Sequence, residues 1–153
     1  MSIGFVGEYT YSVDDKGRLT IPARLRHAFD AGIILTVGLD HCLWGFTRDG
    51  WERFAAKLAS LPSGSANART ITRFFFSQAF EGALDRQGRV LIPENLRQYA
   101  NLSNEAVIAG VGDRIEIWSP EAWQAFKEEQ MANMVAIAEE LGDLASDAHS
   151  RFV

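Results

Sequence analysis

Apolar and polar residues alternate along several short stretches of the chain, which is the pattern of half-buried β-strands. In GEYTYSV, residues 7–13, Tyr9, Tyr11 and Val13 alternate with polar residues. The next residues, Asp-Asp-Lys-Gly, suit a tight turn, because Asp can bond its own backbone and Gly tolerates positive φ. Residues 18–21 then predict a returning strand, and Pro22 fits the first turn of a short helix. We therefore expect a hairpin followed by a helix.

The same patterns predict the elements of the rest of the chain. Strands are expected near 33–38, 43–47, 80–84, 89–92, 106–111 and 114–118, and helices near 50–61 and 68–75. Asp49 and Glu52 form a capping pattern for the helix at 50–61. Ser119 and Pro120 are expected to open a longer helix, whose apolar stripe includes Met134, Ile137 and Leu141.

The chain contains an internal repeat. DDKGRLTIPARLR, residues 14–26, returns as DRQGRVLIPENLR, residues 85–97, and after a one-residue slip the match resumes with Gly38 against Gly110 and Trp51 against Trp123. A unit of about 50 residues with four short strands buries too little apolar surface to be stable alone. We therefore expect two copies with interleaved strands in one pseudo-symmetric, barrel-like α+β core.

Composition and cysteine use exclude several classes of protein. With 47% hydrophobic and 23% charged residues, the chain is typical of soluble globular proteins rather than of disordered or fibrous ones. No apolar run approaches the roughly 20 residues that cross a bilayer, and the N-terminus lacks a signal peptide, so we expect a cytoplasmic protein. Cys42, the single cysteine, is expected to pack as an apolar residue, and the spacing of the three histidines indicates no metal site.

Charge is unevenly distributed along the chain. The net charge of −5 argues against a nucleic-acid partner, but residues 1–77 carry nine Lys/Arg against seven Asp/Glu, whereas residues 78–153 carry six against thirteen. Because the local field matters more than the total, an acidic protein can present a basic face. Much of the acid lies in the C-terminal segment, which is expected either to pack on its own core or to dock a partner.

The first predicted hairpin has the chemistry of a phosphate contact. Lys16 and Arg18 are expected at its exposed tip, with Arg24 and Arg26 just beyond it. Cations on a stiff backbone suit phosphate contacts, and an Arg fork can read guanine in the major groove. The alternative is that Asp14 and Arg18 only pair across the turn and hold it, which the spacing alone favours.

The second hairpin is poorer in spare cations. Gln87 and Asn95 stand where the first copy has Lys16 and Arg24, although Arg86 replaces an aspartate. A structural role is therefore favoured more strongly for the second copy, and the first hairpin is predicted to be the main DNA-contacting edge.

The doubled pattern Asp-x-x-Gly-Arg-x-x-Ile-Pro-x-x-Leu-Arg, joined by TRFFFSQAF, resembles the MraZ family of bacterial regulators from about Gly7 to Phe126. Each copy is similar to the AbrB-like swapped-hairpin unit. The resemblance implies that the two halves imitate an AbrB-type dimer and that subunits form a head-to-tail ring. It also implies binding to short direct repeats in the promoter of the division and cell-wall gene cluster, usually with repression. The family's D-x-x-x-R motif falls on Asp14 with Arg18 and on Asp85 with Arg89.

Together these arguments give a set of expectations. The chain is expected to comprise two AbrB-like repeats at 7–53 and 80–125, a bridging helical segment at 54–79 and an acidic C-terminal helix or tail at 126–153. The predicted DNA-binding residues are Lys16, Arg18, Arg24, Arg26, Arg86 and Arg89, and those that orient the hairpins are Asp14, Gly17, Asp85 and Gly88. No catalytic residue, metal, cofactor, small-molecule substrate or membrane contact is expected. A nucleoid-associated regulator is the main hypothesis, and a non-catalytic protein-binding or scaffolding module is the alternative.

Overall fold

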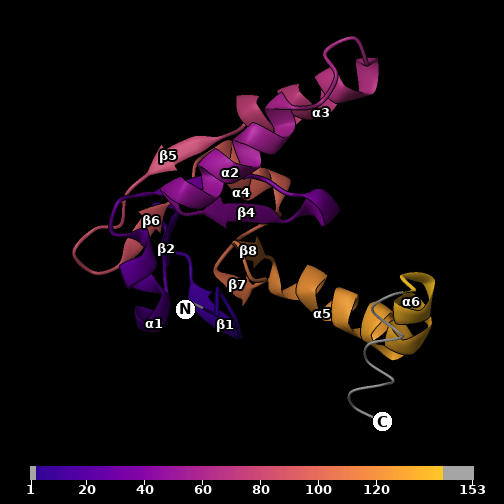
Figure 1. Cartoon of the computed structure of the whole chain (residues 1–153). Helices are drawn as coiled ribbons and strands as arrows, with labels where there is room; N and C mark the ends of the chain where they lie inside the picture. Colours follow the sequence, from indigo (N-terminus) through magenta and orange to yellow (C-terminus); the bar gives the residue numbers. More distant parts are fainter. Residues whose placement is uncertain (1–2, 143–153) are drawn as a thin grey trace. The chain divides into compact units, whose positions relative to one another are not determined.

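A computed structural model of the protein describes residues 3–142 (Figure 1). It divides into a unit that ends at Pro120 and a unit that begins at Glu121. The strands are β1 (Glu8–Ser12), β2 (Arg18–Thr20), β3 (Ile33–Val37), β4 (Leu43–Phe46), β5 (Phe80–Gly82), β6 (Arg89–Leu91), β7 (Glu105–Gly110) and β8 (Ile115–Trp118). The helices are α1 (Ala23–Arg26), α2 (Arg48–Ala59), α3 (Ala66–Ser77), α4 (Glu94–Tyr99), α5 (Pro120–Gln130) and α6 (Met134–Glu140), with short 3-10 turns at His27–Phe29, Leu39–His41 and Met131–Asn133.

The main sheet interleaves the two copies of the repeat, as expected from the sequence. Its strand order is β1-β7-β8-β4-β3-β5, and all neighbours are antiparallel. In the repeat, β1 corresponds to β5, β3 to β7 and β4 to β8, so this order reads the same from both ends. The first strand of each copy therefore pairs with the third strand of the other copy, and the pseudo-symmetry axis passes between β8 and β4.

The second strands of the two copies form a separate two-stranded ribbon. β2 pairs with β6, and Leu19 faces Val90 at the centre of the ladder, where both side chains are fully buried. The predicted turn before β2 is present, but the hairpin itself is limited to one antiparallel bridge, Val13 to Leu19. β2 leaves the turn toward the other copy, so its ladder is with β6 rather than with β1.

The core belongs to both copies at once. The largest fully buried side chains come from each half of the repeat: Phe29, Leu19, Ile21, Ile33, Leu35, Leu43, Ile92, Leu96, Ile108, Ile115, Ile117 and Val90. Within residues 3–142 no ladder joins β1 to β5, so the six-stranded sheet is not closed by hydrogen bonds. The fold is thus mixed α+β with an antiparallel sheet, and the barrel-like closure stays a prediction. No helix in this described range is long and apolar enough to span a membrane.

Helices α2 and α3 lie side by side and pack aromatic residues against the sheet (Figure 1). The ring of Trp44 on β4 stacks on that of Phe75 on α3, with centroids 5.2 Å apart, and meets Phe54 of α2 edge-on at 5.7 Å. The buried hydroxyl of Thr36 donates to the carbonyl of Phe75 at 2.7 Å. Aromatic pairs of this kind add about 0.5–1.5 kcal/mol beyond area burial, so α3 is fixed to the core at this end.

The start of α2 differs from the prediction. The expected cap was Asp49, but the helix begins earlier, and the Thr47 hydroxyl is the N-cap that accepts from the amide of Gly50 at 3.0 Å. Both residues are good caps, and the capping position goes to Thr47 because its backbone is extended there. Asp49 lies instead in the first turn, where a carboxylate suits the helix dipole.

The unit that begins at Glu121 is helical but not one long helix. The expected helix is interrupted at Met131–Asn133. Here the Asn133 side chain donates to the carbonyl of Glu129 at 3.0 Å, which takes the place of the backbone bond of a continuing helix. The rings of Trp123 and Phe126 stack at 5.3 Å, and neither helix buries a residue fully.

Candidate nucleic-acid interface

The first turn is organised around the carboxylate of Asp14. Its Oδ1 accepts from the backbone amides of Lys16 at 3.0 Å and Arg18 at 2.8 Å, and its Oδ2 accepts from Nε of Arg18 at 2.7 Å. The amide of Gly17 donates to the Asp14 carbonyl at 3.0 Å, with Gly17 at a φ of +83°. The backbone amide of Arg18 is the main reason why the pKa of Asp14 lies below its usual value. The predicted pairing of Asp14 with Arg18 is confirmed.

The second turn repeats this geometry. Asp85 accepts from the amides of Gln87 and Arg89, both at 2.9 Å, and from Nε of Arg89 at 2.9 Å. The amide of Arg89 is again the main cause that lowers the pKa of the carboxyl. The sequence difference between the copies therefore leaves the turn frame unchanged.

The two turns are joined to each other. The amide of Ile21 donates to the carbonyl of Gly88 at 2.8 Å, and that of Ile92 donates to the carbonyl of Gly17 at 2.9 Å. Nη1 of Arg89 also lies 3.8 Å from Oδ2 of Asp14, so this aspartate stands between the arginines of both copies. A residue in either turn is thus held partly by the other copy.

Arg26, predicted to bind DNA, is engaged inside the protein. Its Nε donates to the carbonyl of Ile21 at 2.7 Å, and a Cβ on Gly88 would lie 2.1 Å from the same nitrogen. Arg97 makes the mirror arrangement, with Nε donating to Ile92 at 2.9 Å and lying 2.7 Å from a Cβ built on Gly17. Each guanidinium thus lies against the turn glycine of the other copy.

Sequence reasoning missed the role of Arg97, although the repeat could have revealed it. Arg97 aligns with Arg26, and both follow an Ile-Pro that each copy keeps. An arginine repeated in both copies, beside spare cations that are not repeated, is the pattern expected of a structural residue. This difference between repeated and unrepeated cations could have identified Arg97 from the sequence.

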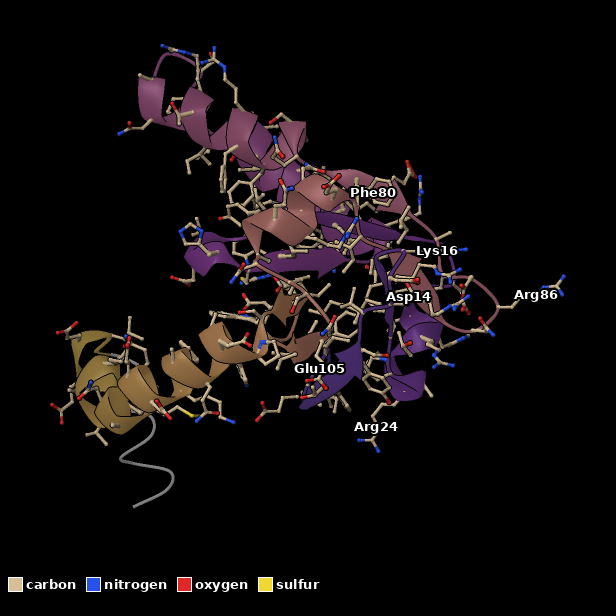
Figure 2. All side chains as sticks on the ribbon, turned by 180° about the vertical axis from the view of Figure 1, so that it is seen from behind. Asp14, Lys16, Arg24, Phe80, Arg86 and Glu105 are labelled. Carbon is tan, nitrogen blue, oxygen red and sulfur yellow. The ribbon has the colours of Figure 1, made fainter. Side chains whose placement is uncertain are left out.

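The predicted cations fall into two groups. Arg18 and Arg89 are half-buried, with 32% and 26% of their side chains exposed, and each pairs with the aspartate of its own turn. Lys16, Arg24 and Arg86 are exposed, and their side chains make no hydrogen bond or ion pair within residues 3–142. Figure 2 shows Lys16 and Arg86 extending to the same side, while Arg24 projects from α1 in another direction. The position equivalent to Arg24, Asn95, is instead bonded to Gln78 at 3.0 Å.

Other reactive groups are few in the described part of the chain. Cys42 is fully buried, its thiol donates to the carbonyl of Leu39 at 3.1 Å, and burial raises its pKa to about 12. No group of three or more His, Cys, Asp or Glu residues in this range could hold a metal ion. The arrangement that remains is a rigid pair of turns with exposed cations, which can contact an anionic polymer.

Comparison with known proteins gives one family. A family model described as "MraZ protein, putative antitoxin-like" matches residues 5–74 and again residues 75–144. A protein named transcriptional regulator MraZ from Roseiflexus castenholzii is 49% identical over 140 residues, covering 92% of this chain and 98% of the relative. Proteins of the same name from Roseiflexus sp. strain RS-1 and Moorella thermoacetica are each 48% identical, over 140 and 139 residues. These matches cover 92% and 91% of this chain and 98% and 97% of the two relatives.

Proposed function

The chain belongs to the MraZ family, and from this premise we propose that it is a non-catalytic transcriptional regulator that binds double-stranded promoter DNA. The observation that carries the proposal is the pair of interlocked turns. They hold Lys16 and Arg86 exposed on a backbone fixed by two aspartates and by hydrogen bonds between the copies. A cation on a rigid support loses little conformational freedom on binding and therefore suits a phosphate contact.

Lys16, Arg24 and Arg86 are the side chains we assign to direct contact with DNA. Nε of Arg18 donates to Asp14, and Nε of Arg89 donates to Asp85. These arginines therefore serve first to shape the turns, and they can contact DNA only through their remaining nitrogens. Arg26, which is half-buried, supports the second turn through its position against Gly88. At the turns, the site we propose therefore consists of exposed Lys16 and Arg86 supported by paired arginines, and Arg24 adds a contact from α1.

The target we propose is a set of short direct repeats in the promoter of the division and cell-wall gene cluster, bound mainly to repress it. Head-to-tail subunits in a ring present their turns in one orientation, which matches repeats that all run the same way. Because each subunit offers few contacts, tethering several in one ring raises the effective concentration of the next one. Such a protein acts in the cytoplasm, at the nucleoid.

The test is binding to the DNA upstream of the protein's own gene across a salt series. With roughly two to four phosphate contacts per engaged subunit, the logarithm of affinity should fall steeply as the logarithm of salt rises. Lys16→Ala should weaken binding, whereas Lys57→Ala, which removes the same charge from an exposed position on α2, should not. The proposal would be overturned if the wild-type protein did not bind this DNA, or if its affinity did not change with the salt concentration.

A protein-binding or scaffolding role is the second candidate, favoured by exposed apolar residues in the unit that begins at Glu121. Met131, Val135 and Leu141 are 58%, 68% and 64% exposed, and apolar side chains left open to solvent are available to a partner. Polar replacement of these three residues should alter complex size but leave the salt dependence of DNA binding if the main proposal holds. Loss of all function with intact DNA binding would favour the scaffold.

A further inference from the structure

A depression of about 360 Å³ lies beside the first copy, away from the turns described above. Its lining combines α1, the first turns of α2, the N-terminal segment and the loop between β7 and β8. Phe5 and Gly112 exchange backbone hydrogen bonds at 2.8 and 2.9 Å, and the ring of Phe5 stacks on Phe29 at 5.3 Å. The floor of the depression is therefore tied to the core.

Two arginines from different helices line this depression. Arg24 comes from α1 and Arg53 from α2, and within residues 3–142 neither side chain makes a hydrogen bond or an ion pair. The lining holds one carboxylate, Asp113, which pairs with Nη1 of Arg114 at 3.3 Å. The depression thus has an excess of positive charge, because Arg24 and Arg53 are unpaired in the described range and Asp113 is already paired with Arg114.

The second copy of the repeat has neither of these two arginines. Arg24 corresponds to Asn95, and Arg53, in the register that aligns Trp51 with Trp123, corresponds to Ala125. The supporting arginines, by contrast, occur in both copies. Since neither arginine is repeated and neither side chain makes a hydrogen bond or an ion pair in the described range, both guanidiniums are available to a ligand.

We propose that Arg24 and Arg53 form a second phosphate-binding subsite, which holds a backbone phosphate of the DNA that the turns contact. This inference rests on the proposed function. Guanidinium groups bind phosphate oxygens by charge-assisted, often bidentate hydrogen bonds. Two guanidiniums from separate helices can grip one phosphate from two sides. The subsite gives the first copy a contact that the second copy lacks, so the protein binds DNA with unequal halves.

The experiment measures affinity for the promoter fragment across a salt series with the full-length protein. Arg24→Gln and Arg53→Gln should each weaken binding at low salt and remove part of the salt slope of about 0.9 that belongs to one phosphate contact. The double variant should lose that slope in full and bind roughly tenfold more weakly. Arg53→Lys should keep most of the slope, because the charge remains. Arg73→Gln is the control, since it removes an exposed arginine from α3, outside this depression.

The outcomes separate this inference from the proposed function. If the wild-type protein does not bind the fragment, the proposed function fails. If it binds and both glutamine variants keep the wild-type affinity and slope, only the subsite is overturned. The subsite is also overturned if the variants change only the oligomer size in light scattering, which would indicate an acidic segment of a second copy in the depression. Calorimetry with inorganic phosphate identifies a free-phosphate site if the variants lose phosphate binding but keep DNA affinity, and that result overturns the DNA assignment.

Discussion

At the scale of single residues, each turn glycine has a positive φ and lies so close to an arginine of the other copy that a Cβ would overlap it. Gly88 has a φ of +77°, and a Cβ there would lie 2.1 Å from Nε of Arg26, which would have to leave its bond to Ile21. Gly88→Ala should therefore lower the free energy of unfolding by about 2–3 kcal/mol. Gly112→Ala is the matched control, because Gly112 has a φ of +94° and nothing lies within 4 Å of a Cβ there. Urea denaturation of both variants measures the difference, and an equal midpoint for the two would mean that the packing of Arg26 against Gly88 does not stabilise the fold.

The two turn aspartates predict a specific pH dependence. Their pKa values are lower in the folded protein than the ordinary aspartate value of 3.8, chiefly because backbone amides of Arg18 and Arg89 donate to them. Folding therefore favours the ionised carboxylates. Their contribution is present above the unfolded pKa and is lost as the pH falls below 3.8 through the folded values. Asp14→Asn should remove part of this acid-induced loss of stability.

The measurement is the urea midpoint between pH 6 and pH 2 for the wild type, Asp14→Asn, Asp85→Asn and the double variant. Asp15→Asn serves as the control, because its exposed side chain makes no hydrogen bond in the range that the structure describes. The double variant should show the flattest profile. A profile for Asp15→Asn as flat as that of Asp14→Asn would assign the acid sensitivity to general charge rather than to the turns.

At the scale of elements, the start of α2 distinguishes two candidate caps. Thr47 accepts from the amide of Gly50, whereas Asp49 lies inside the first turn. Thr47→Ala should cost about 1 kcal/mol of stability, and Asp49→Ala about 0.3–1 kcal/mol through the helix dipole. Thermal unfolding with both variants ranks them. If Asp49→Ala is the more damaging, Asp49 rather than Thr47 caps the helix.

The strands and turns could be predicted from the sequence, but the pairing of β2 and the cap of α2 could not. Alternation in GEYTYSV and the Gly and Pro positions were enough to predict the strands and turns, because those signals are local. Pairing of β2 with β6 was not a local signal, since the residues of β2 suit a hairpin equally well. Thr47 and Asp49 are both good caps, so only backbone geometry separates them. The depression that Arg24 and Arg53 line is formed by segments that lie far apart in the sequence. For this reason the sequence pattern could not identify Arg53 as a candidate site residue.

At the scale of the whole molecule, the interleaved sheet makes each copy depend on the other. In residues 1–79, β1 would lack β7, β2 would lack β6 and β4 would lack β8. Each strand would then expose main-chain donors and acceptors together with apolar side chains that the other copy now covers. The sheet and the paired turns consequently need both copies of the repeat to form one folded body.

This dependence predicts that residues 1–79 do not fold as a monomer. The fragment alone, at low concentration, should show no cooperative thermal transition, and mixing it with residues 80–153 should restore one as a complex with one copy of each. Because the sheet order reads the same from both ends, two copies of residues 1–79 could also pair with each other at high concentration, with β2 against β2. Sedimentation and circular dichroism over a concentration series distinguish these states. A cooperative transition in the monomeric fragment, independent of concentration, would mean that the first copy has its own core and that the interleaving seen between the copies is not what stabilises the fold.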